Sequence, residues 1–378
     1  MIDPRVYLIG ESLLTQENAE GGKEMTGTTN QETPFDKQAQ SYQVGWRKKY
    51  KLAGDNWGWQ NGVQREHILP ARQWLLGIWP PIRNALNGYI YASGIQPNAG
   101  KHNLKSSWSQ CANLFFPFRS GPRMAAVLSG FLAQQLGLKV THIEGLELEY
   151  AAPGNLEPKR LLGELGGKKG SGQTSPDVAI LFGCEDGKSG IYLIENKYTE
   201  HSFYDCSGAQ KTLSKTHSQR GLPPNPDTNR CRNAIKVLRN PEEMCQQQTW
   251  GRKYWSVLRS AANEEVLQQC GYCPALAGGY QLFRQQALAQ GIASSGLFDH
   301  VISGVAYDFR NTAIIHCLKS IGVDNFASGW PRLFSTDVRF HCFTHQDFVS
   351  YIRQSNDRFC QKWIAYITKR YDYRKASQ

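Results

Sequence analysis

One stretch in the middle of the chain, SPDVAILFGCEDGKSGIYLIENK at residues 175–197, constrains the fold more than any other. It contains two short apolar runs, 178–182 and 191–194, whose length and β-branched residues predict two strands. The sequence between them, CEDGKSG, has the aspartate and glycines typical of a turn. The stretch therefore predicts a β-hairpin, with Asp177 opening the first strand and Glu195 and Lys197 closing the second.

These three polar residues can meet at one end of the hairpin, because the first residue of an antiparallel strand lies beside the last residues of its partner. Side chains alternate with period two along a strand, so Glu195 and Lys197 face the same side. Two carboxylates can hold a hard divalent cation, with the lysine beside them. The hairpin therefore predicts a site for metal-assisted attack of water on a phosphodiester.

Elements on both sides of the hairpin indicate an α/β protein. Upstream, apolar spacing predicts a helix from Pro122 that ends at Gly137. A strand follows in KVTHIEGLELEY, with Glu147 and Glu149 on one face. Downstream, AGGYQLFRQQALAQGI predicts a helix, VISGVAYDF and DVRFHCF predict two strands, and a final helix is expected from about Gln346.

This series, with Pro-Asp opening one strand and Glu-Asn-Lys closing the next, resembles the PD-(D/E)XK nuclease superfamily, the restriction-endonuclease-like proteins. The resemblance implies an α/β fold with a mixed central β-sheet flanked by helices. It implies that Asp177 and Glu195 bind Mg²⁺ or Mn²⁺ and that Lys197 positions or activates the attacking water. An upstream acidic residue would be a further ligand, Glu149 in preference to Glu147.

The acid-x-Lys triplet alone is not specific, because it occurs again at 157–159 and 186–188. Asp186 and Lys188 lie in the predicted turn, where a solvated surface role is expected. Only Asp177 and Glu195 each sit at the end of an apolar strand with an acidic strand upstream. The alternative for Glu195 and Lys197 is a surface ion pair.

The helix after the motif offers a Gln and other polar side chains to the site in many of these nucleases. Gln281 occupies that place here, and the resemblance implies a catalytic role for it; the alternative is an exposed polar residue. Arg284 lies three positions on, on the same helix face, and could clamp the scissile phosphate.

The chain is basic, with 43 Lys and Arg against 32 Asp and Glu and a net charge of +11. Such an excess favours a polyanionic partner. Ten basic residues face three acidic ones in residues 206–260, a predicted helical insertion that would bind duplex DNA through residues including Arg230, Arg232 and Lys236. The alternative is a solvated basic helix face.

Two further segments bear on nucleic-acid binding. The glycine-rich loop GGKKGSGQTSP carries Lys168 and Lys169, which can approach phosphates closely, unless it is simply a mobile loop. The segment 102–118 gathers small polar residues, including Gln110 and Asn113, around an apolar run. Buried polar groups must be hydrogen-bonded, so we expect these residues to order the structure rather than contact nucleic acid directly.

Cysteines are frequent after the motif, and Cys270 and Cys273 form a C-x-x-C pair. Some members of the superfamily carry a zinc ion or an iron–sulfur cluster on cysteines around the core. The resemblance therefore raises a structural Zn²⁺ or Fe–S site, against buried free thiols as the alternative. The candidate ligands are Cys206, Cys231, Cys245, Cys270 and Cys273.

The expected domain organisation has four parts: a flexible tail at 1–41, an N-terminal accessory region at 42–121, the nuclease core at 122–345 with a basic, cysteine-containing insertion at about 206–275, and a basic amphipathic helix at 346–378.

The chain has no apolar run near the ~20 residues of a spanning helix and no signal-peptide pattern. Ten cysteines without such a signal indicate a reducing compartment, so we expect a cytoplasmic protein with no membrane partner.

The sequence thus predicts a metal-dependent nuclease that hydrolyses DNA, an endonuclease in restriction or in defence against phage and mobile elements. Cutting two strands often takes two active sites, so a homodimer or larger assembly is expected. Two alternatives stay open: a nucleic-acid-binding module on a nuclease scaffold with weak or lost cleavage, and an RNA-directed nuclease.

Overall fold

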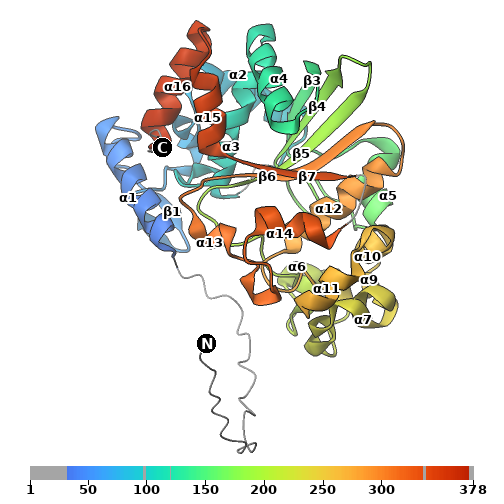
Figure 1. The fold of residues 1–378 in the computed structure, drawn as a ribbon. Coiled ribbons are helices and arrows are strands. Elements are labelled where there is room, and N and C mark those ends of the chain that lie inside the picture. The colour runs from blue at the N-terminus through green and yellow to red at the C-terminus, as the bar shows by residue number, and fades with distance from the viewer. Residues whose placement is uncertain (1–31, 97–98, 120, 335–337, 374–378) are drawn as a thin grey trace, which may run out of the picture. The chain divides into compact units, whose positions relative to one another are not determined.

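A five-stranded mixed β-sheet forms the centre of the structure (Figure 1). Its strands lie side by side in chain order, the first three antiparallel and the last three parallel. They are β3 (Val140–Leu148), β4 (Val178–Cys184), β5 (Ser189–Lys197), β6 (His300–Tyr307) and β7 (Arg339–Thr344). The expected mixed sheet flanked by helices is therefore present. A separate two-stranded sheet pairs β1 (Gly58–Gln60) with β2 (Val63–Arg65).

The structure is a computed structural model that describes residues 32–96, 99–119, 121–334 and 338–373. The predicted hairpin is confirmed as β4 and β5, which pair from Val178 opposite Ile194 to Gly183 opposite Ser189. The turn between them uses Gly187 at φ +77°, a backbone conformation that favours glycine.

Both faces of the sheet are buried, and the side chains of β4 and β5 alternate between them as period two requires. Ile180 and Tyr192 pack into one apolar cluster, whereas Ala179 and Leu193 pack into the other. A strand buried on both faces reads as a continuous apolar run, which is what the sequence of β5 shows.

One face is covered by helices from both ends of the described chain. In Figure 1 the helices α4 and α15 lie on this side of the sheet, and their apolar residues share one cluster with β4 and β5. The helices are α1 (Pro34–Lys49), α2 (Arg83–Ala92), α3 (Ser107–Phe115), α4 (Pro122–Leu136), α15 (His345–Arg353) and α16 (Arg358–Tyr371). The predicted helix from Pro122 is confirmed as α4, and Gly137 ends it at φ +61°.

The opposite face is covered by α12 (Tyr280–Ala293), the predicted post-motif helix, together with shorter helices. Residues 206–275 form mainly short helices, of which the longest, α11, has seven residues. The remaining helices are α5 (Pro158–Leu162), α6 (Lys215–Gln219), α7 (Ala234–Arg239), α8 (Pro241–Met244), α9 (Gln246–Thr249), α10 (Tyr254–Leu258), α11 (Glu264–Cys270), α13 (Thr312–Ile315) and α14 (Phe326–Leu333).

Two boundaries differ from the expected organisation. Residues 1–31 of the expected tail lie outside the described residues, but 34–41 are helical, because Thr33 caps α1 and Phe35 and Ala39 are buried. The expected C-terminal helix is two helices, since Asp357 accepts hydrogen bonds from two backbone N–H groups and starts α16 anew. Within the described residues, no helix is both long enough and apolar enough to cross a bilayer.

Candidate active site

Three acidic residues gather at one end of the sheet, where β3 ends, β4 begins and β5 ends. Asp177 directly precedes β4, and its Oδ2 accepts a hydrogen bond from the backbone N–H of Asn196 at 2.8 Å. Glu149 directly follows β3, and its backbone N–H donates to the carbonyl of Asp177 at 3.0 Å. The antiparallel register therefore brings Asp177 and Glu195 to the same end of the hairpin, as predicted, and places Glu149 of the neighbouring strand end beside them.

These residues line a polar cavity of about 270 Å³. The loop that runs from Gly170 to Pro176 forms one wall, and helix α12 contributes Gln281 and Arg284 to another. The cavity therefore collects the predicted carboxylates and both predicted residues of the post-motif helix.

Lys197 lies beside the carboxylates in a buried position, with only 2 % of its surface exposed. Its Nζ is 3.0 Å from Glu195 Oε1 and donates a hydrogen bond to Gln281 Oε1 at 2.7 Å. Burial by itself would lower the pKa of Lys197, but the neighbouring negative charges, Glu195 foremost, raise it above its ordinary value. Lys197 is thus a positive charge held in place by its partners. Because Lys197 is buried, its pair with Glu195 is not the surface ion pair considered as the alternative.

Two of the acids have strongly perturbed pKa values. Burial, with the charge of Glu195 adding to it, raises the pKa of Glu149 to about 8. Burial and the charges of Glu195 and Glu149 likewise raise the pKa of Asp177 well above its usual range. A cation bound among these carboxylates would stabilise their charged forms. Strongly shifted pKa values of this kind are typical of functional sites.

The two candidate upstream acids occupy different surroundings. Glu149 is buried and lines the cavity, and its backbone takes φ +49°, a left-handed conformation that is strained for a non-glycine residue. The Glu147 carboxylate instead lies 3.3 Å from Lys169 Nζ, and its side chain is 38 % exposed. Only Glu149 faces the cavity with Asp177 and Glu195.

Arg284 is held at the cavity wall by Thr174 and by the buried acid Glu164, which sequence reasoning did not select. Arg284 Nε donates to Thr174 Oγ1 at 2.9 Å and lies 3.7 Å from Glu164 Oε1. The Glu164 carboxylate also accepts hydrogen bonds from the backbone and hydroxyl of Thr174 and from the hydroxyl of Tyr254. Glu164 lies in a loop without a regular pattern, so nothing local in the sequence marks it.

Asn196, between the two charged residues of the motif, is held from behind by a buried network. Its Nδ2 donates to Gln110 Oε1 at 2.7 Å, and its Oδ1 lies 2.9 Å from His345 Nε2. Gln110 Nε2 donates to Tyr373 Oη at 2.7 Å and contacts His345 Nδ1 at 2.9 Å. Because His345 Nδ1 must accept here, the imidazole is neutral with its proton on Nε2; burial also lowers the pKa of His345 to about 4.

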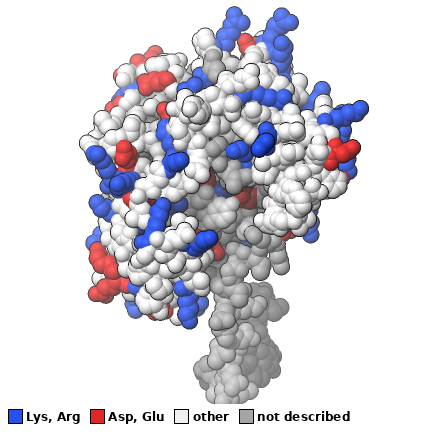
Figure 2. Space-filling model, turned by 180° about the vertical axis from the view of Figure 1, so that it is seen from behind, with Lys and Arg blue, Asp and Glu red and all other residues white. Residues whose placement is uncertain are grey.

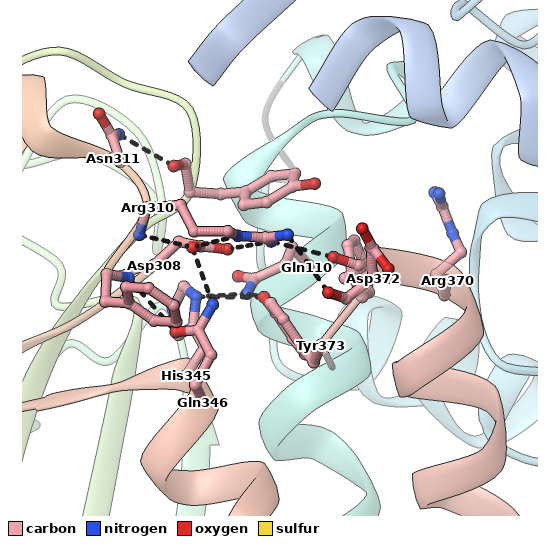
Figure 3. A network of polar contacts seen from close by, with 12 residues as sticks. Gln110, Asp308, Arg310, Asn311, His345, Gln346, Arg370, Asp372 and Tyr373 are labelled. Atoms are coloured by element: carbon pink, nitrogen blue, oxygen red, sulfur yellow. Dashed lines mark hydrogen bonds and ion pairs between the residues drawn. The ribbon is translucent and has the colours of Figure 1, made fainter. Parts of the chain in front are cut away.

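Figure 3 shows Gln110, His345 and Tyr373 of this network beside a second network, in which Asp308 accepts hydrogen bonds from Arg310 at 2.6 Å and from Gln346 at 2.8 Å. The structural role expected for Gln110 and Asn113 is confirmed. Asn113 bonds the backbone of Trp79 and Gly77. His345, Tyr373 and the Asp308–Arg310 pair were not selected from the sequence.

The side chains predicted to contact nucleic acid differ in whether they are exposed or already bonded to the protein itself. Arg230 is committed to the protein itself: its guanidinium donates to Glu243 O, Asn225 Oδ1 and Gln246 Oε1. Arg232, Lys236 and Lys168 are exposed, and Lys169 is paired with Glu147 as above. Their contact with nucleic acid stays a prediction.

Four of the five candidate cysteines come together, and all ten cysteines of the chain are free thiols. Cys206, Cys231, Cys245 and Cys273 line one small enclosed cavity, which Cys270 does not reach. Burial raises the pKa of Cys206 and of Cys231 to about 12. In the part of the chain that the structure describes, no three His, Cys, Asp or Glu side chains form a group that could hold a metal ion as it stands. The structural metal stays a prediction.

The mixed sheet flanked by helices, with acids and a lysine at the ends of adjacent strands, is compatible with the class of restriction-endonuclease-like proteins. The chain belongs to the family described as "Restriction Endonuclease associating with ARP", whose family model matches residues 30–372. This membership indicates a nuclease of the restriction-endonuclease type. No curated protein and no solved structure matches the chain.

Proposed function

We propose that the chain is a divalent-metal-dependent endonuclease that hydrolyses phosphodiester bonds in DNA, acting in restriction or another defence against phage and mobile elements. One observation carries the proposal: Glu149, Asp177 and Glu195 line one cavity, and the buried cation Lys197 lies beside it, 3.0 Å from Glu195 Oε1. The family membership supports the nuclease activity.

The donor set fits Mg²⁺ or Mn²⁺. These ions prefer oxygen ligands, and Mg²⁺ is commonly held by one or two protein carboxylates while water and substrate phosphate fill its other positions. A pre-assembled group of three protein ligands is therefore not required. Asp177 and Glu195 would hold the ion, with Glu149 as a further ligand. When bound, it supplies a more acidic water and neutralises charge that develops on the phosphate.

The cations of the protein have separate tasks in this proposal. Lys197 is fixed by Glu195 and Gln281, so it can position the attacking water and stabilise negative charge on the phosphoryl oxygens without first reorganising. Arg284, held by Thr174 at the cavity wall, can bind the scissile phosphate. The net charge of +11 supports a polyanionic substrate.

The test is cleavage of duplex DNA, single-stranded DNA and RNA of the same sequence, with Mg²⁺, with Mn²⁺ and with EDTA. We expect metal-dependent cutting of DNA that falls by at least about 100-fold in Asp177→Asn and in Lys197→Ala. The chain offers matched controls: Asp186→Asn and Lys188→Ala alter the exposed acid-x-Lys triplet of the turn and should cut like wild type.

Each other outcome has a definite meaning. Salt-dependent DNA binding without cleavage under any metal would favour the nucleic-acid-binding module. Cutting of RNA in preference to DNA would favour the RNA-directed nuclease. Cutting that Asp177→Asn and Lys197→Ala leave unchanged would contradict the proposed site.

A further inference from the structure

A second groove, of about 720 Å³, adjoins the catalytic cavity. Tyr91, at the end of α2, lies on its rim with 91 % of its surface exposed. Trp74 also lines the groove, together with two lysines, Lys101 and Lys168. We call these four residues the aromatic–basic groove.

The groove and the cavity share a wall, which is the glycine-rich loop. The loop is tied to the groove by the backbone of Gln96, whose N–H donates to Lys169 O at 2.9 Å. At Gly170 the loop packs closely against Gln96 on the groove side and Glu149 on the cavity side. A Cβ at this position would lie 2.9 Å from Gln96 O and 2.9 Å from Glu149 Cδ. Lys168 lines the groove, whereas Gly170, Ser171 and Gly172 line the cavity.

A run of side-chain contacts also connects the two sites. Lys101 Nζ lies 5.6 Å from the centre of the Trp74 ring. Trp74 meets Trp108 edge to face at 5.8 Å, and Trp108 hydrogen-bonds the Glu149 side chain. The groove is therefore built onto the same residues that position the catalytic acid.

An exposed aromatic ring beside lysines has the chemistry of a binding surface for single-stranded nucleic acid. Bases stack on aromatic rings, and lysines pair with the phosphates between them. A base inside a duplex cannot use such a ring, because neighbouring base pairs cover both of its faces. The groove volume falls in the range of sites for small organic ligands, roughly 300–1,000 Å³, which suits a nucleotide rather than a duplex.

We propose that the aromatic–basic groove holds the nucleic-acid strand next to the scissile phosphate, with an unpaired base on Tyr91 and phosphates at Lys101 and Lys168. The proposal rests on the proposed nuclease function and adds a substrate class to it. The favoured substrate is DNA whose strand is unpaired beside the cleavage point, such as a duplex with a single-stranded extension.

Binding tests the groove without depending on cleavage. The probe is a fluorescein-labelled oligo(dT), titrated at constant salt into the non-cleaving Asp177→Asn protein. Adding Tyr91→Ala should weaken binding about 10-fold, whereas Tyr91→Phe should keep it, because a phenyl ring still stacks. Lys101→Ala with Lys168→Ala should weaken binding and reduce the slope of log affinity against log salt by about 1.4, since each single-strand phosphate contact contributes about 0.7.

Cleavage with Asp177 intact tests the substrate class. Wild type should cut a duplex with a single-stranded extension faster than the blunt duplex, and Tyr91→Ala should remove most of that difference. Tyr50→Ala and Lys139→Ala alter an exposed aromatic and an exposed lysine outside the groove and serve as controls.

The two proposals fail in different ways. If the groove variants bind oligo(dT) and cut both substrates like wild type, the groove proposal is overturned while the nuclease stands. If wild type cuts nothing under any metal, the nuclease function fails, and the oligo(dT) titration still decides whether the groove binds a strand.

Discussion

Glu149 is the residue on which the geometry and the electrostatics of the cavity converge. Its backbone is left-handed, its side chain is buried, and its carboxylate lies among others. Strain of this kind persists only where surrounding contacts impose it. Here the backbone bond from Glu149 to Asp177 O and the close packing of Gly170 do so. The fold thus keeps the strained, buried Glu149 at the place where its carboxylate would stabilise a bound cation.

The raised pKa of Glu149 has a consequence for stability. Folded Glu149 keeps its proton up to about pH 8, whereas an unfolded glutamate loses it near pH ~4.3. The folded state binds more protons between these values, so in EDTA this group lowers the free energy of unfolding as pH rises through that window. Glu149→Gln should make the fall between pH 5 and pH 8 shallower, as measured by urea unfolding.

Glu147→Gln is the matched control, because Glu147 is two positions away, partly exposed and paired with Lys169. It should leave the pH dependence close to that of wild type. Equal slopes for wild type and Glu149→Gln would show that the carboxyl is not held protonated in the folded protein.

At the scale of elements, strand β5 depends on two helices behind it. α3 supplies Gln110 and α15 supplies His345, and both hold the side chain of Asn196. The strand carries Glu195 and Lys197 on either side of that residue, so its position sets theirs. A buried amide without hydrogen-bond partners destabilises the folded state. The end of β5 therefore needs Gln110 and His345 to hold Asn196 in place.

His345→Leu should therefore destabilise the fold by about 1–3 kcal/mol, because the buried carboxamides of Asn196 and Gln110 lose a partner. Chemical denaturation at neutral pH measures the change. His316→Leu is the control: His316 is exposed, and its hydrogen bond to Asp324 O lies at the surface. A loss of stability as large in His316→Leu would contradict this role of the network.

Elements with a local pattern could be predicted from the sequence, and so could residues at strand ends. The β4–β5 hairpin carries its own apolar runs and turn, and α4 its proline and terminal glycine. The break before α16 was missed, because the apolar stripe of Trp363 and Ile367 continues a helical pattern that the cap at Asp357 interrupts. His345 and Tyr373 could not be found, since their partners lie 149 and 263 positions away.

At the scale of the whole molecule, charge is the dominant feature. Lysine and arginine side chains are spread over the face seen in Figure 2, among fewer acidic ones. The 206–260 segment holds ten basic residues against three acidic ones, although Arg230 is used within the protein. Of the three residues of this segment predicted to contact DNA, Arg232 and Lys236 are exposed and remain candidates for phosphate contact.

Replacing Arg232 and Lys236 with alanine should weaken duplex DNA binding and reduce the slope of log affinity against log salt by about 2. The measurement is a salt titration in the Asp177→Asn protein, without metal. Lys139→Ala with Lys188→Ala removes the same charge at the far end of the β3–β4 pair, where each lysine has an acidic partner. Equal loss of slope in both double variants would mean that the segment has no special part in binding.

The order of the residues around Asn196 has a consequence for biosynthesis. The carboxylates and Lys197 emerge from the ribosome early. Gln281, which accepts the lysine's hydrogen bond, lies 84 positions after Lys197, and His345 lies 149 positions after Asn196. Strand β5 also lacks its parallel neighbour β6 until residues 300–307 have been made. A nascent chain therefore carries every acidic group of the cavity well before the residues that hold the strand end in place have been made.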